Sequence, residues 1–447
     1  MNILVLDSIW SIVDTVDEGR TKLYDLFKYP VVKMIKIKGK LRRTVEYESM
    51  IGPTGYFFTG LLPLVQESFP DCTIAYQHRP IRYRVELSDS VGSFIFEPYQ
   101  KDQIYTALKY RRGILDAITG TGKTVVAMGI IKALHLRPTL ILLSSTDLLY
   151  QTQEVLQKTF RMPIGIIGDK KKDIQQITIA LTQSLSKWNH YDIEETFKDL
   201  ALVITDEAHH AQSNSYIDIL KAIKCSYRIG LTGTPKEPQK NLGYYFKVAG
   251  ILGPILHRVK VSDAPKRLVS PHLKILSYKQ NPYAKYIDWP WIYEWGIVRN
   301  VDRNQKLLGA VRYYTARNKS VLIIVRRINH GEILQKMMPS LPFVQGKDDA
   351  ETRRTIKQYV QGKAHAAIST TIFGEGVDMP ELDVVIIAGG YSSDQAAIQY
   401  AGRVLRRTAN KSEGIIIDFR DIGHTILKRH FYNRYKHYKE RLQVIEI

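Results

Sequence analysis

The chain has 447 residues, of which 44% are apolar, so it is long enough to bury more than one hydrophobic core. Lys and Arg exceed Asp and Glu by 64 − 44 = 20 charges, which favours a polyanionic partner, with nucleic acid ahead of an anionic membrane surface. No apolar run reaches the ~20 residues of a membrane-spanning helix. Met1–Asp7 lacks a basic leader, so we expect a soluble, cytoplasmic protein. Two distant cysteines, Cys72 and Cys225, argue against a disulfide framework or zinc site and predict buried, reduced thiols.

The first stretch, residues 1–94, predicts a small basic α+β domain. Apolar and basic residues alternate around Gly39, as in a half-buried hairpin, and the basic ones are Lys36, Lys38 and Lys40. Residues 56–69 predict a helix, and residues 81–87 predict a strand that carries Arg82 and Arg84 on one face. A charge run is usually a solvated face, so duplex binding by this surface and simple solvation stay equally open.

From residue 96 onward, short and nearly all-apolar runs alternate with polar loops and helical patterns. Strands of this kind are buried on both faces of a parallel sheet covered by helices. The runs form two series, 139–143, 201–204 and 227–231, then 320–325, 366–369, 384–388 and 414–418. We therefore predict two tandem α/β domains with parallel sheets, at 95–255 and 299–425. An aromatic-rich linker at 256–298 leads into the second sheet, and a basic helix at 426–447 ends the chain.

A phosphate-binding loop is indicated where a buried strand, residues 114–118, runs into Thr119-Gly120-Thr121-Gly122-Lys123-Thr124 and then a helical pattern. Glycines let backbone N–H groups turn inward onto phosphate oxygens, and the following helix offers its positive end. Lys123 is expected to reach the β- and γ-phosphates of ATP, and Thr124 to hold Mg²⁺. Ala117 stands where the GxxxxGK[ST] pattern begins with Gly.

An acidic pair follows another buried strand, where residues 201–205 lead directly into Asp206-Glu207-Ala208-His209. In that position Asp206 can bind Mg²⁺ through water, and Glu207 can orient or deprotonate the attacking water. An isolated Asp-Glu pair is usually a solvated loop. After a phosphate loop and a buried strand, the pair indicates the second half of a nucleotide site.

Asp206-Glu207-Ala208-His209 resembles motif II of the DExH group of superfamily 2 helicases, and the other family motifs can be found in order. Six further segments resemble the other family motifs: motif I at 117–124, Ia at 144–151, Ib at 182–185, III at 231–235, V at 370–378 and VI at 399–406. The resemblance implies two RecA-like domains that hydrolyse ATP and move on nucleic acid. The compact size and Phe58–Leu62 look most like the phage UvsW-type helicases that remodel branched DNA, which would place the chain in the host-cell cytoplasm.

The resemblance also implies roles for individual residues. The catalytic set is Lys123, Asp206, Glu207, Gln399, Arg403 and Arg406, with the two arginines as fingers that neutralise charge in phosphoryl transfer. Further ATP contacts are Gln100, Thr119, Gly120, Thr121, Gly122, Thr124, Gly376 and Asp378. Coupling between the ATP and DNA sites falls to His209, Thr232 and Thr234. Backbone-phosphate contacts, which read no bases, are Thr146, Gln183 and Thr370, with Lys36, Lys38 and Lys40 from the N-terminal domain.

The expected partner is DNA, branched or partly single-stranded, with ATP and Mg²⁺ as cofactors and with neither a membrane nor an obligatory protein partner. An RNA helicase of the DEAH group and the translocase motor of a restriction system remain alternatives. From a different class, a non-catalytic nucleic-acid clamp also remains open. The aromatic cluster at 283–295 is interpreted as core, slightly ahead of a base-stacking surface.

Overall fold

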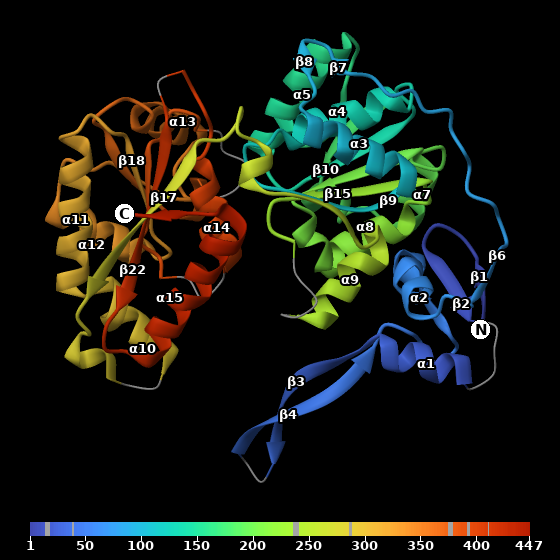
Figure 1. The fold of residues 1–447 in the computed structure, drawn as a ribbon, viewed down its shortest axis with the longest axis horizontal. Coiled ribbons are helices and arrows are strands. Elements are labelled where there is room, and N and C mark those ends of the chain that lie inside the picture. The colour runs from blue at the N-terminus through green and yellow to red at the C-terminus, as the bar shows by residue number, and fades with distance from the viewer. Residues whose placement is uncertain are drawn as a thin grey trace. The chain divides into compact units, whose positions relative to one another are not determined.

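The computed structural model describes residues 1–13, 18–37, 40–235, 241–285, 288–373, 379–390, 394–409 and 411–447. The chain forms two compact units, shown in Figure 1. Unit 1 comprises residues 1–117 and 122–258, and unit 2 comprises residues 118–121 and 259–447. Across these described ranges, no helix is both long enough and apolar enough to span a bilayer.

An eight-stranded sheet forms the centre of unit 1, in the order β12-β11-β13-β10-β14-β15-β9-β16. Its strands are β9 (Arg112–Ala117), β10 (Thr139–Leu143), β11 (Gly165–Gly168), β12 (Lys171–Lys172), β13 (Ile177–Leu181), β14 (Leu202–Asp206), β15 (Tyr227–Thr232) and β16 (Ile255–Val259). The six strands from β11 to β9 run parallel. Alternate residues of β9, β10, β11, β13 and β14 enter different core clusters, because successive side chains point to opposite faces.

Helices cover both faces of this sheet. They are α3 (Pro98–Tyr110), α4 (Lys123–Ala133), α5 (Thr146–Phe160), α6 (Thr182–Leu185), α7 (His190–Thr196), α8 (Asn214–Ala222) and α9 (Leu242–Leu252), with the 3-10 helix η2 (Ala208–Gln212). One core cluster takes apolar residues of α3, α4 and α5, and the other takes those of α7, α8 and α9. The strands are therefore apolar on both sides, as the sequence predicts.

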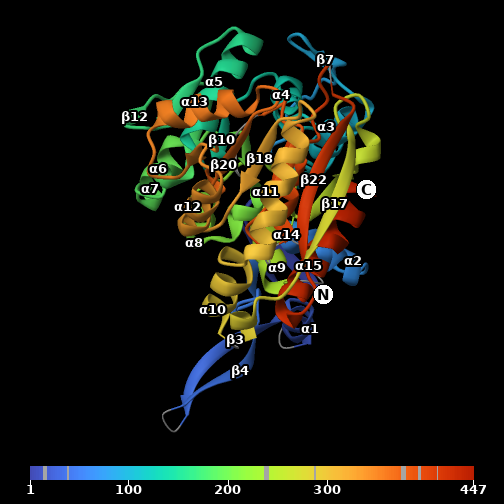
Figure 2. The same ribbon diagram turned by 90° about the vertical axis from the view of Figure 1, so that its left-hand side faces the viewer.

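Unit 2 has a seven-stranded parallel sheet in the order β19-β20-β18-β21-β22-β17-β23. The strands are β17 (Ser270–Tyr278), β18 (Val321–Ile324), β19 (Phe343–Val344), β20 (Ala366–Ser369), β21 (Val384–Ile387), β22 (Glu413–Asp421) and β23 (Ile445–Glu446). The helices, many of them visible in Figure 2, are η3 (Val261–Asp263), η4 (Pro282–Lys285), α10 (Trp289–Tyr293), η5 (Glu294–Val298), α11 (Val301–Thr315), α12 (Ile328–Met337), α13 (Ala350–Val360), η6 (Thr371–Phe373), α14 (Asp394–Arg403), α15 (Thr425–His437) and η7 (Tyr438–Leu442). Two tandem RecA-like domains, the predicted fold class, are confirmed.

The N-terminal residues form a small α+β module within unit 1. Its sheet has the order β5-β2-β1-β6, and β3 and β4 form a separate two-stranded ribbon that extends away from it in Figure 1. The elements are β1 (Asn2–Val5), β2 (Trp10–Val13), α1 (Glu18–Leu26), β3 (Lys28–Ile37), β4 (Lys40–Ser49), β5 (Tyr56–Phe58), η1 (Thr59–Leu61), α2 (Leu62–Ser68) and β6 (Thr73–Tyr76). A short hairpin, β7 (Ser90–Val91) and β8 (Phe94–Ile95), leads to α3.

The module shares a hydrophobic core with α9. Phe27 meets Phe246 edge to face, with ring centroids 5.3 Å apart, and both belong to one buried cluster. A Cβ at Gly60 would lie 2.2 Å from the carbonyl oxygen of Ala249, so only glycine lets η1 approach α9 this closely. The module and the first RecA-like domain are therefore joined through a continuous packed interior.

The structure corrects several sequence predictions. The predicted helix at 56–69 begins as strand β5 and becomes α-helical only at Leu62, with Pro63 in its first turn, where proline is tolerated. The predicted strand at 81–87 has no strand assignment: Ile81, Val85 and Leu87 are exposed, and only Tyr83 packs against the core of unit 1. Arg82 and Arg84 therefore do not lie on any sheet that the described residues form. Cys72 is only half-buried, whereas Cys225 is buried as predicted. Strands β3 and β4 pair antiparallel, with Ile37 opposite Lys40, as the predicted hairpin requires. The predicted helix at 426–447 forms as α15 and η7 but ends at Leu442, and Ile445–Glu446 form strand β23 beside β17.

Candidate active site and nucleic-acid interface

Three functional segments leave the unit 1 sheet at one edge. In the parallel register Asp116 of β9 lies opposite Thr232 of β15, and Leu231 lies opposite Asp206 of β14. The carboxyl ends of adjacent parallel strands meet at the same edge, which is where α/β sheets bind ligands. The sheet therefore brings together the phosphate loop, the Asp-Glu pair and the Thr232–Thr234 loop.

The phosphate loop has the backbone that its glycines permit. Gly120 and Gly122 have φ values of 94° and 89°, in the left-handed region that favours glycine. The Thr121 hydroxyl donates to the carbonyl of Ile118 at 2.7 Å and closes the turn. Helix α4 then begins at Lys123, so its N-terminal N–H groups and positive dipole end stand beside that side chain. Thr124, the predicted metal contact, is exposed in the first turn of α4.

A chain of polar contacts links the loop to the acidic pair. Lys123 Nζ lies 3.0 Å from Glu207 Oε1, and both side chains are nearly buried. The second oxygen, Glu207 Oε2, lies 3.3 Å from His209 Nδ1. His209 Nδ1 is in turn 3.0 Å from the hydroxyl of Thr232. The structure thus connects two predicted catalytic residues with two predicted coupling residues.

The pKa values of the two carboxyl groups in the acidic pair shift in opposite directions. Burial alone would raise the pKa of Glu207, but Lys123 and His209 more than offset it and hold that pKa below its ordinary value. For Asp206 burial dominates and raises the pKa, and the neighbouring Glu207 charge adds to the rise. Burial disfavours the charge on Lys123, whereas Glu207 and Asp206 together raise its pKa. Glu207 is therefore held ionised, while the charge of Asp206 is stabilised by any added cation.

The backbone at the acidic pair is bent to make these contacts. Glu207 has φ 48°, in the left-handed region, and its N–H donates to Asp206 Oδ1 at 2.9 Å. Non-glycine residues rarely adopt this conformation, and such strain occurs mostly at functional sites. Thr234 N donates to the Thr232 hydroxyl at 3.1 Å, which fixes the loop after β15.

Two residues of this region were not predicted from the sequence. Tyr244 of α9 donates its hydroxyl to the carbonyl of His209, so it ties the coupling residues to the helix beneath the N-terminal module. Asp116 is fully buried at the end of β9 and pairs with Arg258 at 3.1 Å. A signal for Asp116 existed, because a carboxylate within an otherwise apolar strand needs a partner. Tyr244 gave none, since a tyrosine in an apolar helix usually indicates core.

The structure locates the remaining predicted ATP contacts in two groups. Gln100 is buried, and its Oε1 accepts from Glu97 N at 3.0 Å in a capping box at the start of α3. In unit 2, Gln399 and Arg403 stand one turn apart on α14 and are almost fully buried. Arg406 follows the helix and forms an antiparallel bridge with Leu268. Gly376 and Asp378 lie outside the described residues.

The predicted DNA contacts also follow parallel strands. Thr146 follows β10 at the start of α5 and Gln183 follows β13, and these neighbouring strands pair with Leu143 opposite Leu181. Both Thr146 and Gln183 are exposed. Thr370 comes directly after β20 in unit 2, and its carbonyl accepts from Ser369 Oγ at 2.8 Å. Of the three lysines, Lys36 and Lys40 lie on the β3–β4 ribbon with undescribed side chains, and Lys38 lies outside the described residues.

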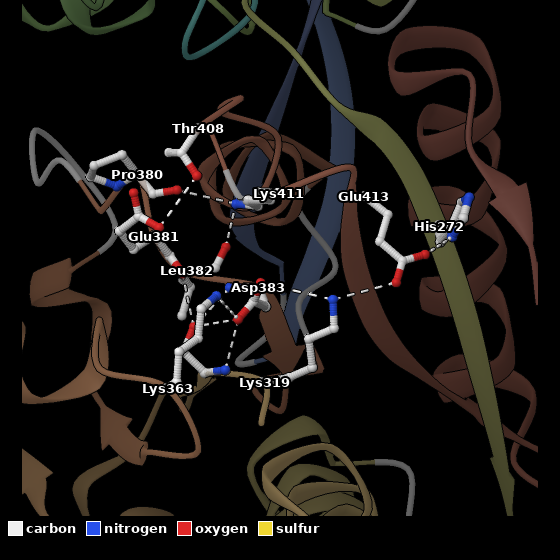
Figure 3. A network of polar contacts seen from close by, with 11 residues as sticks. His272, Lys319, Lys363, Pro380, Glu381, Leu382, Asp383, Thr408, Lys411 and Glu413 are labelled. Atoms are coloured by element: carbon white, nitrogen blue, oxygen red, sulfur yellow. Dashed lines mark hydrogen bonds and ion pairs between the residues drawn. The ribbon is translucent and has the colours of Figure 1, made fainter. Parts of the chain in front are cut away.

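A polar network at the opposite, amino edge of the unit 2 sheet anchors the segment that follows α14 (Figure 3). Buried Asp383 accepts from Ser320 N and from Lys363 Nζ, both at 2.9 Å. Lys411, which is 4% exposed, donates to the carbonyls of Leu382 and Pro380. Burial lowers the pKa of Lys411 to about 8. This network ties together the segments that lead into β18, β20 and β21. It lies at the opposite end of these strands from Thr370.

Two family comparisons cover most of the two RecA-like domains. Residues 93–237 match the family described as "Type III restriction enzyme, res subunit", and residues 302–408 match "Helicase conserved C-terminal domain". The chain belongs to the superfamily 2 helicases. It is 25% identical to the "DNA 3'-5' translocase XPB2" of Sulfurisphaera tokodaii, over 76% of this chain and 82% of that protein. It is 24% identical to the "ATP-dependent DNA helicase uvsW" of Enterobacteria phage T4, over 74% of this chain and 70% of that protein.

A solved structure bears on the fold of this helicase. The chain superposes on "ATP-dependent Type ISP restriction-modification enzyme LlaBIII bound to DNA" with a TM-score of 0.58, at 16% identity, over 80% of this chain and 32% of that chain. At that identity the likeness concerns the fold alone. Together, the two matched families and the helicase relatives make this protein an ATP-dependent helicase or translocase.

Proposed function

We propose that this helicase uses ATP hydrolysis to remodel or unwind branched DNA, such as forks and four-way junctions. The observation that carries the proposal is the β3–β4 ribbon, which extends from a module packed on α9 of the first RecA-like domain. A translocating motor does not itself need such a projection. A two-stranded ribbon has the width to lie in a groove of duplex DNA, and its lysines suit phosphate contacts without base readout.

For the ATP site, we propose that Lys123 and the loop amides bind the phosphates and that Glu207 orients the attacking water. Thr124 and Asp206 supply hard oxygen donors, the kind that Mg²⁺ prefers, and a cation would compensate the burial that raises the pKa of Asp206. Mg²⁺ bound there would neutralise charge on the transferred phosphate. From the second domain Gln399, Arg403 and Arg406 complete the proposed catalytic set, with Gly376 and Asp378 against the nucleotide, and Gln100 contacts the adenine.

Along the DNA strand, we propose that Thr146 and Gln183 hold phosphates on the first RecA-like domain and that Thr370 holds them on the second. Their exposed positions after parallel strands of unit 1 support the first pair. Because each domain would bind the strand separately, ATP-driven opening and closing of the two domains would move the protein along the strand. His209, Thr232 and Thr234 would carry the nucleotide state toward these grips.

The test uses the full chain, because removing the module would expose the apolar face of α9. The variant is Lys36→Gln/Lys38→Gln/Lys40→Gln. The control removes three positive charges from exposed lysines that pair with a glutamate three or four residues away, Lys22, Lys158 and Lys198. ATPase and unwinding are measured on forked, four-way and linear DNA and on RNA, at one fixed salt concentration.

We expect the wild type to prefer branched DNA and the ribbon variant to lose that preference, because a few phosphate contacts supply affinity for the duplex arms. The control should keep the preference. Equal activity of the wild type on linear and branched DNA refutes the proposal. Stronger stimulation by RNA than by DNA would favour the RNA-helicase alternative instead.

A further inference from the structure

The aromatic residues before α11 divide into a buried part and an exposed part. Ile292, Tyr293 and Ile297 are buried in one cluster with Leu427 of α15, in line with the prediction of core. Three other rings reach the surface: Tyr283 is 62% exposed, Trp291 is 43% exposed, and Trp295 is partly exposed. We call Tyr283, Trp291, Trp295 and the neighbouring Arg299 the aromatic patch.

The rings of the aromatic patch are held in place by one another. Trp295 lies 5.0 Å from Tyr283 and 5.9 Å from Trp291, measured between ring centroids. Trp291 Nε1 donates to the carbonyl of Tyr283 at 2.7 Å, and the guanidinium of Arg299 stands 5.7 Å from the Trp295 ring. Exposed rings that are already ordered lose little conformational entropy when a ligand stacks on them.

The patch is fixed to the carboxyl edge of the unit 2 sheet. Tyr293, beside it in α10, donates its hydroxyl to the carbonyl of Gly389, two residues beyond the end of β21. Glu294 accepts from Arg327, which comes shortly after β18, at 3.2 Å. Thr370, the proposed phosphate contact, follows β20 at this same edge, because β20, β18 and β21 are parallel neighbours.

Positive charge accompanies the rings at this edge. Arg326 is exposed directly after β18, with its guanidinium 5.9 Å from the Tyr293 ring. Arg299 pairs with Glu294 at 2.6 Å, and Arg327 shares that carboxylate, so one acidic group faces two arginines there. Single-stranded nucleic acid binds to surfaces of this kind. Arginines contact its phosphates, and exposed aromatic rings stack on its unpaired bases.

We propose that the aromatic patch stacks unpaired bases of the DNA strand that the second RecA-like domain holds. A duplex hides the faces of its bases, so the patch selects single-stranded DNA, and stacking on every base's π-face leaves the selection independent of sequence. The inference rests on DNA as the partner and not on the preference for branched DNA. The two ideas can therefore fail separately.

The test compares Tyr283→Ala and Trp291→Leu with a matched control, Tyr313→Ala. Tyr313 is 52% exposed near the end of α11, toward the amino edge of the sheet, and carries the Arg317 guanidinium 3.6 Å from its ring. Binding is measured by fluorescence anisotropy with an oligothymidylate, an abasic strand of the same length and a blunt duplex. Thermal melting confirms that each variant is folded.

We expect each patch variant to bind oligothymidylate roughly tenfold more weakly, the loss typical of one stacked base. Abasic strand and duplex should be bound as by the wild type, and Trp291→Phe should restore most of the affinity. Oligothymidylate should quench the tryptophan fluorescence of the wild type and quench that of Trp291→Leu less. An unchanged affinity, or an equal loss on the abasic strand, overturns the proposal and leaves a protein-docking surface as the interpretation. Neither outcome depends on how the enzyme ranks forks against linear DNA.

Discussion

The contact between Lys123 and Glu207 makes a specific prediction about Glu207→Gln. The lysine that is proposed to bind ATP phosphates is paired, in the structure, with the carboxylate that is proposed to orient water. At 3.0 Å and an effective dielectric of ~20, the Coulomb attraction between them is ~5 kcal/mol. The cost of desolvating both groups cancels most of it. Phosphates must nevertheless compete with Glu207 for Lys123, so this carboxylate opposes ATP binding while it promotes hydrolysis.

Glu207→Gln keeps the shape of the side chain and removes its charge. We expect kcat for ATP to fall by about 10²–10⁴, the usual contribution of a positioned general base, which is about 3–5 kcal/mol in the barrier. The dissociation constant for ATP should stay the same or fall by up to about tenfold, because Lys123 no longer pairs with a carboxylate. Single-turnover ATPase measures the first quantity, and equilibrium binding of a fluorescent ATP analogue measures the second.

Lys123→Ala serves as the converse variant. It removes the cation and leaves Glu207 with His209 alone, so the affinity for ATP should weaken together with turnover. Both variants should melt within a few degrees of the wild type. The reasoning is refuted if Glu207→Gln binds ATP much more weakly than the wild type, or if it retains turnover within a few-fold.

Three further predictions concern unit 2. Arg403→Ala and Arg406→Ala should each lower ATP turnover far more than ATP binding, because a finger acts mainly on charge that develops in the transition state; equal losses in both assays would make them binding residues. Arg434→Met should destabilise the fold by about 3–5 kcal/mol, since it leaves buried Asp418 without the two 2.8 Å bonds from that guanidinium; a melting temperature like that of the wild type would contradict this. Lys411→Met should flatten the pH dependence of stability between about pH 8 and 10.5, because the unfolded chain binds more protons there than a folded lysine with a pKa of about 8. Denaturant unfolding measures this: as the pH falls from 10.5 to 8, the free energy of unfolding of the wild type should drop by up to about 3 kcal/mol relative to that of the variant.

The sequence signals for the proposed ATP site are local. A glycine-rich loop between an apolar strand and a helix has few alternative structures, and Lys123 follows it directly. The contact between Lys123 and Glu207 spans 84 residues, but the parallel sheet order brings the ends of β9 and β14 to one edge. Strand order is not written in any one segment, so the sequence predicted the two halves and their neighbourhood but not the pairing.

Elsewhere, periodicity in the sequence did not predict which residues are buried. Residues 81–87 alternate like a strand, yet Ile81 and Leu87 are more than half exposed, and none of the strands in the described part of the chain pairs with them. Strand β17 lies in the interior of the second sheet, although the sequence prediction placed its residues in the aromatic-rich linker at 256–298. The same limit applies to the aromatic segment, where Tyr293 is buried and Tyr283 is exposed ten residues away. Tertiary contacts, which composition does not contain, separate the two.

A continuous set of contacts in unit 1 joins the proposed chemistry to the N-terminal module. Glu207 contacts His209, and the carbonyl of His209 accepts from Tyr244 at the start of α9. The same helix carries Phe246 into the core of the module and presses its backbone against Gly60. Packed interiors transmit small displacements because they have no room to absorb them. We therefore expect a shift of Glu207, when Lys123 turns to a phosphate, to displace α9 and with it the module that carries the ribbon.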